Sequence, residues 1–145
     1  MPLTRDEDIA DLLASARTIA MVGASDRPDR PSYGVMKFLQ DWGYRVIPVN
    51  PQITGVHVHG EFVWRELGQI GVPIDIVDIF RRPQAAAEAV DQAIFAGAKA
   101  VWMQIGVINE EAAAKAEAAG LKVVMDRCPK IEIPRLRVPR IAAEA

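Results

Sequence analysis

The clearest indication of the fold is the stretch Thr18-Ile19-Ala20-Met21-Val22-Gly23-Ala24-Ser25. Its first five residues form a compact, mostly apolar run that ends directly at Gly23. The loop that follows, up to residue 32, is rich in Gly, Pro, Asp and Arg. This combination is typical of a buried strand of a parallel sheet that runs into a loop.

Runs of the same kind recur along the chain and alternate with helical patterns. We expect further strands over residues 45–49, 74–80, 100–103 and 122–125. Helices are expected over residues 33–42, 83–95 and 110–119, the last of them capped by Asn109. Such alternation indicates parallel βαβ units. The sequence therefore predicts an α/β fold: a single Rossmann-like, doubly wound domain over 1–145, with a mainly parallel five-stranded sheet and helices on both faces.

Three segments outside this alternation carry weaker patterns. Thr4 and Glu7 have the spacing of a capping box, which predicts a short amphipathic helix near the start of the sequence. Residues 51–73 contain a brief alternation of valines and then a short helical candidate over 62–67. The tail from Asp126 contains three prolines and is expected to lie extended over the surface.

The composition is that of an ordinary globular domain. Of the 145 residues, 50% are hydrophobic and 25% are charged, which excludes a mostly disordered chain, a collagen-like fibre and a coiled-coil rod. The formal net charge of -2 provides no global basic field, so neither nucleic acid nor an anionic membrane is an expected partner. The single cysteine, Cys128, suits a reducing compartment, and no targeting or membrane-spanning segment is visible. We expect a cytoplasmic location.

The first strand-end loop departs from the standard nucleotide-binding motifs, although open parallel sheets do bind ligands at the carboxyl ends of their strands. The G-x-G-x-x-G fingerprint of NAD sites needs glycines where Ser25 and Pro28 stand, and Asn50 follows the second strand in place of an acidic residue. The sequence contains no G-x-x-x-x-G-K-[ST] loop. NAD and ATP hydrolysis are therefore disfavoured. The remaining features, with Arg27 and Arg30 in a longer loop, favour another anionic nucleotide.

Five blocks of sequence are more specific and point to one protein family. In chain order they are Val22-Gly23-Ala24-Ser25 with Arg30-Pro31-Ser32-Tyr33, Gly43-Tyr44-Arg45-Val46-Ile47-Pro48-Val49-Asn50-Pro51, Phe80-Arg81-Arg82, Val101-Trp102-Met103-Gln104-Ile105-Gly106, and Met125-Asp126-Arg127-Cys128-Pro129-Lys130. Together they resemble the bacterial CoA-binding proteins whose fold matches the N-terminal domain of the succinyl-CoA synthetase alpha subunit. The resemblance implies that the first loop holds a pyrophosphate and that adenosine lies over the ends of the first strands. The sequence includes no second domain for a phosphohistidine, so the ligase chemistry is not carried over.

The strand-end positions and the resemblance together select a set of residues for coenzyme A or an acyl-CoA. The predicted ligand-binding residues are Gly23, Ala24, Ser25, Arg27, Arg30, Ser32, Tyr33, Asn50, Pro51, Phe80, Arg81, Arg82, Gln104 and Gly106. No catalytic residue and no metal ligand is predicted. A larger side chain in place of Gly23 is expected to abolish binding and to leave the fold largely intact.

Other interpretations of single residues stay open at this point. If their segment is a strand, His57 and His59 point to one side with Glu61 next, a spacing that can bind a metal. Asp78 lies near a strand end, where a carboxylate can serve as a general base. Trp102 near the end of another strand either borders the ligand or packs in the core.

The class of function is also open between three alternatives. A non-catalytic CoA-binding module agrees with the arginine-bearing loops and with the lack of a recognisable set of catalytic residues. A small enzyme acting on a CoA thioester would use Asp126 or Cys128, whose basic neighbours favour a reactive thiolate. For Cys128 a buried, inert thiol in a tight Cys-Pro turn is the favoured role. An interaction protein would have lost its ligand and would bind a partner through its tail.

Overall fold

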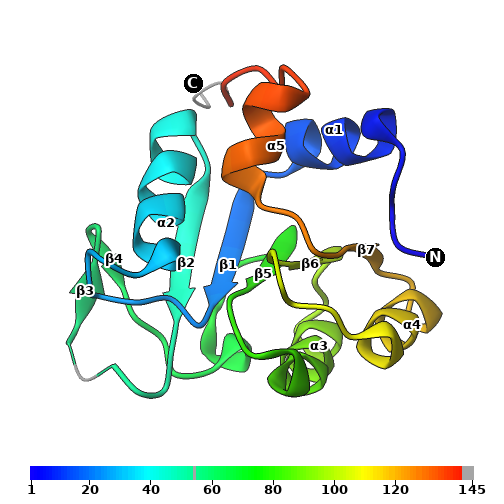
Figure 1. The fold of residues 1–145 in the computed structure, drawn as a ribbon. Helices are drawn as coiled ribbons and strands as arrows, with labels where there is room; N and C mark the ends of the chain where they lie inside the picture. Colours follow the sequence, from blue (N-terminus) through cyan, green and yellow to red (C-terminus); the bar gives the residue numbers. More distant parts are fainter. Residues whose placement is uncertain (54, 142–145) are drawn as a thin grey trace.

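Five parallel strands form the centre of the molecule, in the order β2-β1-β5-β6-β7 (Figure 1). The computed structural model describes residues 1–53 and 55–141. The strands are β1 (Thr18–Val22), β2 (Arg45–Val49), β5 (Ile76–Ile79), β6 (Ala100–Met103) and β7 (Lys122–Val124), and every adjacent pair runs parallel. This arrangement confirms the predicted fold class. It forms because the strands are mostly apolar and can be buried on both faces.

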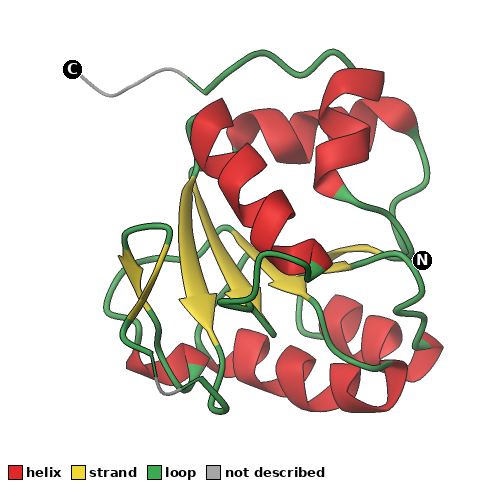
Figure 2. Cartoon of the chain, turned by 60° about the vertical axis from the view of Figure 1, so that its left-hand side comes forward, coloured by secondary structure: helices red, strands yellow, loops and turns green. Residues whose placement is uncertain are grey.

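Helices cover both faces of this sheet (Figures 1 and 2). Helices α1 (Asp6–Ser15), α2 (Pro31–Trp42) and α5 (Pro129–Arg135) lie on one face, and α3 (Ala86–Phe95) and α4 (Glu110–Ala118) lie on the other. A 3₁₀ turn, η2 (Pro83–Ala85), leads into α3. Within the described part of the chain, no helix has both the length and the apolar character needed to cross a membrane.

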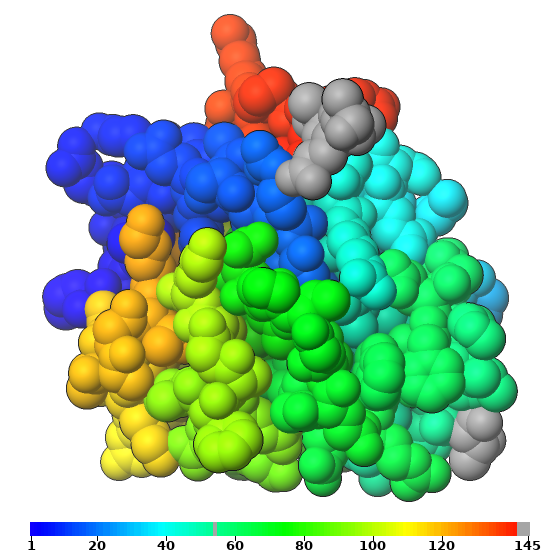
Figure 3. Space-filling model, turned by 180° about the vertical axis from the view of Figure 1, so that it is seen from behind, coloured from blue at the N-terminus to red at the C-terminus, as the bar shows by residue number. Residues whose placement is uncertain are grey.

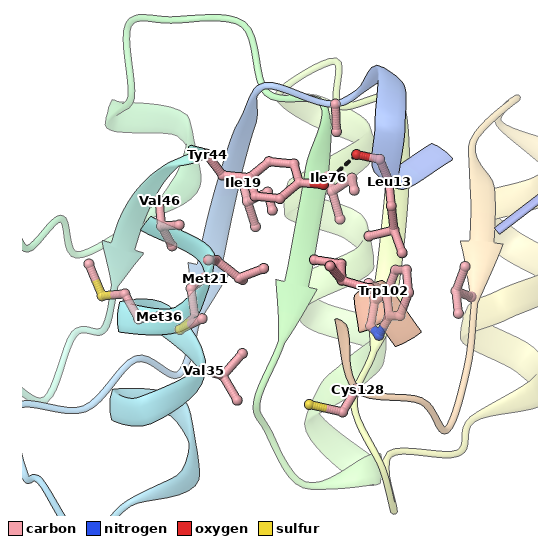
Figure 4. Packing of buried hydrophobic residues seen from close by; sticks show 14 of the residues in the cluster. Leu13, Ile19, Met21, Val35, Met36, Tyr44, Val46, Ile76, Trp102 and Cys128 are labelled. Carbon is pink, nitrogen blue, oxygen red and sulfur yellow. Dashed lines mark hydrogen bonds between the residues drawn. The ribbon is translucent and has the colours of Figure 1, made fainter. Parts of the chain in front are cut away.

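Successive residues of each strand contribute to two separate hydrophobic clusters. Ile19 and Met21 of β1 pack with the α1, α2 and α5 layer, whereas Ala20 and Val22 pack with α3 and α4, as the period of two in a strand requires. Figure 4 shows the first cluster, in which the Tyr44 hydroxyl donates a hydrogen bond to the Leu13 carbonyl. Packing on both faces fixes the positions of the strands, and therefore of the loops at their carboxyl ends.

The segment between β2 and β5 forms a hairpin rather than the helix expected over 62–67. Strands β3 (His57–Val58) and β4 (Glu61–Phe62) are antiparallel. A two-residue turn joins them, with positive φ at His59 (48°) and Gly60 (81°), the backbone geometry that matches the twist of a hairpin. The 3₁₀ turn η1 (Leu67–Gln69) follows. The helical expectation was wrong because this turn geometry overrides the short apolar pattern.

The predicted capping box at the start of the first helix is also wrong. Helix α1 begins at Asp6, its N-cap is Arg5, and no side chain of the described residues caps it. The Glu7 carboxylate pairs instead with the Arg5 guanidinium. Three acidic residues in the first turn offset the helix dipole in place of a cap.

The tail from Asp126 is not extended throughout, because residues 129–135 form helix α5. Pro129 occupies the first helical turn, where its missing N–H costs nothing. Ile133 is fully buried, and buried Glu132 accepts hydrogen bonds from Arg127 (2.7 Å) and Arg135 (2.9 Å). Burial of Ile133 in the core, together with these local ion pairs, selects a helix that the prolines alone do not predict. Figure 3 shows the C-terminal segment, in red, beside the N-terminal helix, in blue.

Candidate functional site

A cavity of about 620 Å³ lies at the carboxyl ends of β1, β2 and β5. The strand order reverses at β1, since β2 lies on one side of it and β5 on the other. Such a switch point leaves a crevice between diverging loops. The cavity is lined by the segments 23–27, 30–32, 50–53 and 80–81.

Gly23 brings the first loop into direct contact with the end of β5. Its φ is +87°, and its N–H donates to the Val49 carbonyl at 2.9 Å. A Cβ at this position would stand 2.1 Å from the Phe80 carbonyl oxygen and 3.1 Å from Cδ of Arg81. Only glycine combines this backbone angle with this close approach.

Asn50 connects the two loops on either side of the cavity. Its Nδ2 donates to the Ala24 carbonyl at 2.7 Å, and its Oδ1 accepts from the Gln52 backbone N–H at 2.8 Å. Its own backbone N–H donates to the Trp64 carbonyl at 2.8 Å. Both polar ends of the side chain are thus engaged within the protein.

The N-terminus of α2 opens into the cavity without a cap. Its N-cap residue, Arg30, makes no side-chain capping bond, and Pro31 follows. Ser32 is only 4% exposed, yet it lines the cavity and its hydroxyl contacts no protein partner among the described residues. Pro31 has no N–H and the Tyr33 N–H donates to the Arg30 carbonyl at 3.1 Å, but the Ser32 N–H has no acceptor among the described residues. With the partial positive charge of the helix terminus, this end of α2 suits an anion.

Further donors surround the same space. Within residues 1–53 and 55–141, the backbone N–H groups of Ala24, Ser25 and Asp26 donate to no protein acceptor. The guanidinium groups of Arg27, Arg30 and Arg81 are exposed at the cavity, and they form no ion pair with a described residue. Asp26 is the one acidic residue in the lining segments. The electrostatic balance of the cavity is therefore positive.

Most of the predicted ligand-binding residues line this cavity. They are Gly23, Ala24, Ser25, Arg27, Arg30, Ser32, Asn50, Pro51, Phe80 and Arg81. The lining residues absent from the prediction are Asp26, Pro31, Gln52 and Ile53. Pro31 could have been found as the first residue of a helix next to the loop, whereas residues 52 and 53 lie in a segment without a periodic pattern.

Four predicted residues lie outside the cavity lining. Tyr33 turns toward the hairpin, where its ring centroid lies 4.0 Å from that of His59 and its carbonyl hydrogen-bonds with Nε2 of His59 at 2.9 Å. Arg82 is the exposed N-cap of η2. Gln104 and Gly106 follow β6, farther along the same sheet edge.

The metal alternative at the two histidines does not fit this geometry. Strand β3 ends at Val58, so His59 lies in the turn, and its ring is engaged by Tyr33. His57 is exposed on the strand itself. In the part of the chain that the structure describes, no three His, Cys, Asp or Glu residues gather closely enough to hold a metal ion.

The alternative catalytic groups also lie away from the cavity lining. Asp78 is fully buried in β5, between Met21 and Trp102 of the neighbouring strands, and neither carboxylate oxygen has a partner among the described residues. Burial raises the pKa of the Asp78 carboxyl well above its usual range. The Asp126 carboxylate accepts a hydrogen bond from the Gly106 N–H at 2.8 Å.

Cys128 and Trp102 belong to the hydrophobic core. Cys128 is 8% exposed at the start of α5, and Figure 4 shows it within the first cluster beside Val35. Trp102 is fully buried, with Nε1 donating to the Arg127 carbonyl at 2.8 Å. Packing accounts for both side chains.

Comparison with known proteins assigns the chain to a class. Residues 17–134 match the family described as CoA binding domain, and the chain belongs to this family. It is 40% identical over 124 residues to the uncharacterized protein YneT of Bacillus subtilis (strain 168), an alignment that covers 86% of this chain and 90% of that protein. Among solved structures, it is similar to a hypothetical protein from Pyrococcus horikoshii OT3, with a TM-score of 0.89, 42% identity, and coverage of 94% of this chain and 96% of that chain.

A larger enzyme shares the fold. The apo form of the dinucleotide forming acetyl-coenzyme A synthetase 1 of Ca. Korarchaeum cryptofilum matches with a TM-score of 0.69 and 21% identity, over 82% of this chain and 28% of that chain. At this identity the likeness concerns the fold alone. The predicted resemblance to a CoA-binding domain is confirmed by the family match.

Proposed function

We propose that the cavity binds coenzyme A or an acyl-CoA through the phosphates, and that this chain is a binding module without catalysis of its own. The observation that carries the proposal is the uncapped N-terminus of α2, where Ser32 and the first-loop N–H groups that have no acceptor among the described residues share one cavity. Membership of the family supports CoA binding in general.

The charges of the site agree with this ligand. CoA carries a pyrophosphate and a ribose 3′-phosphate, together about four negative charges near neutral pH. Arg27, Arg30 and Arg81 provide forked donors that can satisfy several phosphate oxygens at once. The backbone N–H groups of Ala24, Ser25 and Asp26 suit the pyrophosphate, which leaves the arginines for the more exposed 3′-phosphate.

The rest of the ligand has a path along the sheet edge. Ile79 and Met103 are register partners, so Gln104 lies beside Phe80, which lines the cavity. Gln104 is 7% exposed, and its Oε1 has no hydrogen-bond partner among the described residues. The amide N–H groups in the arm of CoA are donors of the kind that a buried carbonyl oxygen needs. We therefore place the arm toward Gln104 and Gly106.

A comparative titration tests the proposal. In calorimetry with CoA, dephospho-CoA, NAD and ATP, we expect CoA to bind most tightly, because Ser25 and Asn50 replace the features of a dinucleotide site. At 100 times its dissociation constant, CoA should raise the free energy of unfolding by about 2.7 kcal/mol. Tighter binding of NAD would contradict the proposal, and consumption of acyl-CoA during the titration would show an enzyme instead.

Single arginine substitutions test the contribution of each side chain to phosphate binding. We expect Arg27→Ala, Arg30→Ala and Arg81→Ala each to weaken CoA binding about tenfold or more, since a charge-assisted hydrogen bond contributes roughly 1.5–3 kcal/mol. Arg82→Ala is the matched control, because Arg82 adjoins Arg81 but does not line the cavity.

Salt provides the second readout of the arginine test. The affinity of the wild type should fall as ionic strength rises, and that of the three cavity variants should fall less. If all four variants bind within twofold of the wild type at low salt, the arginines do not hold the phosphates, and the loop N–H groups provide the anion site.

A further inference from the structure

Asn50 occupies the position after β2 at which a dinucleotide site has an acidic residue, yet its side chain is directed into the protein's own backbone. Nδ2 donates to the Ala24 carbonyl at 2.7 Å, and Oδ1 accepts from the Gln52 N–H at 2.8 Å. The first contact crosses from β2 to the loop after β1, and the second closes the turn that leads to Ile53. Asn50 therefore connects two walls of one cavity.

The contact with Ala24 fixes one particular peptide group. In a trans peptide the carbonyl and the N–H point in opposite directions, and the described chain contains no cis peptide. While Nδ2 of Asn50 holds the Ala24 oxygen, the Ser25 N–H points in the opposite direction within that peptide plane, away from Asn50. This N–H donates to no protein acceptor among the described residues.

The orientation of this peptide decides the local charge that an anion meets. A rotation that exchanged its two ends would replace a partial positive N–H with a partial negative carbonyl oxygen. This rotation would occur about ψ of Ala24 and φ of Ser25, and the Ser25 N–H has no acceptor among the described residues that would restrain it, so an external contact selects one orientation. The side-chain amide of Asn50 provides this contact. Asn50 is itself held in place because its backbone N–H donates to the Trp64 carbonyl.

We infer that Asn50 is a positioning residue of the anion site: it orients the Ala24–Ser25 peptide so that the Ser25 N–H is available to a phosphate oxygen. This inference rests on the proposed function, because it takes the phosphates of CoA as the anion. It assigns Asn50 a role distinct from the direct ligand contact expected from the sequence.

The test compares Asn50→Asp with Gln52→Glu. Asn50→Asp is nearly isosteric, but its carboxylate cannot donate to the Ala24 carbonyl. Gln52→Glu adds the same charge to the same loop and leaves both hydrogen bonds of Asn50 in place, because Gln52 contributes only its backbone N–H. We expect CoA affinity to fall at least about tenfold further in Asn50→Asp than in Gln52→Glu.

A ligand-free measurement separates orientation from direct contact. In ¹H–¹⁵N spectra of the apo protein, Asn50→Asp should move the Ser25 amide signal, and Gln52→Glu should leave it in place. Lowering the pH protonates the new carboxyl, which then offers one donor and one acceptor as the amide does. The Ser25 signal should return toward its wild-type position, and CoA affinity, relative to the wild type at the same pH, should recover.

An unchanged Ser25 signal in Asn50→Asp would overturn the inference, as would equal losses of affinity in the two variants. Failure of the wild type to bind CoA would overturn the proposed function instead. The apo spectra would still report whether Asn50 orients the loop, so the two failures are distinguishable.

Discussion

Gly23→Ala is expected to destabilise the fold and to abolish CoA binding together. The added Cβ would stand 2.1 Å from the Phe80 carbonyl oxygen, a backbone atom that cannot rotate away. Overpacking of this kind costs about 1–3 kcal/mol, and the left-handed backbone adds roughly 1–2 kcal/mol for a residue other than glycine. The structure therefore corrects the expectation that a side chain here would spare the fold.

Urea denaturation and CoA titration of the same variant measure both effects. Gly34→Ala is the matched control, since Gly34 lies in α2 and, apart from its chain neighbours and the adjacent helix backbone, no atom of the described residues lies within 4 Å of its added Cβ. In a helix this change should stabilise the protein by about 0.5–1 kcal/mol. A wild-type urea midpoint for Gly23→Ala would show that the loop does not pack on β5 as described.

Asp78→Asn is expected to stabilise the protein increasingly as the pH rises. Burial raises the pKa of Asp78 in the folded state, whereas the unfolded chain ionises near its ordinary value of about 3.9. Between these two values the unfolded state loses a proton that the folded state retains, so the wild type loses stability as the pH rises. A neutral amide removes this dependence.

Asp75→Asn is the control of opposite sign in the same region. Burial acts to raise the pKa of Asp75, but hydrogen bonds from the Thr18 and Arg17 N–H groups and the charge of Lys99 lower it overall. Asp75→Asn should therefore destabilise the protein at neutral pH, with a difference that shrinks as the pH falls toward 4. Denaturation midpoints between pH 4 and 8 measure both series. A constant offset for Asp78→Asn would contradict a neutral buried carboxyl.

The parts of the fold that the sequence predicted are those with a local pattern. Each of the five strands is an apolar run that needs no partner to be recognised, and Asn109 caps α4 as expected, its Oδ1 accepting from the Ala112 N–H at 3.0 Å. Helix α5 lacks such a pattern. Burial of Ile133 in the first cluster and the ion pair of Arg135 with Asp6 stabilise it, and these contacts involve residues distant in the sequence.

In the candidate site too, local sequence patterns predicted some features and long-range contacts decided the others. Their positions at strand ends were sufficient to predict that Gly23, Asn50 and Arg81 lie at one cavity, because parallel strands end on one edge of the sheet. It could not decide the direction of side chains at the start of α2. There Ser32 enters the cavity, whereas the next residue, Tyr33, packs on His59 of the hairpin. That choice depends on where the hairpin lies.

The two faces of the sheet are completed at different moments of synthesis. The α3 and α4 layer has all of its strands and helices once β7 has been made. The opposite layer still lacks α5 and the segment in which the Pro139 carbonyl accepts from Nε1 of Trp42 at 3.1 Å. Chains emerge from the ribosome N-terminus first. Water is therefore excluded from the core shared by α1, α2 and Trp102 only after residues 129–141 have been made.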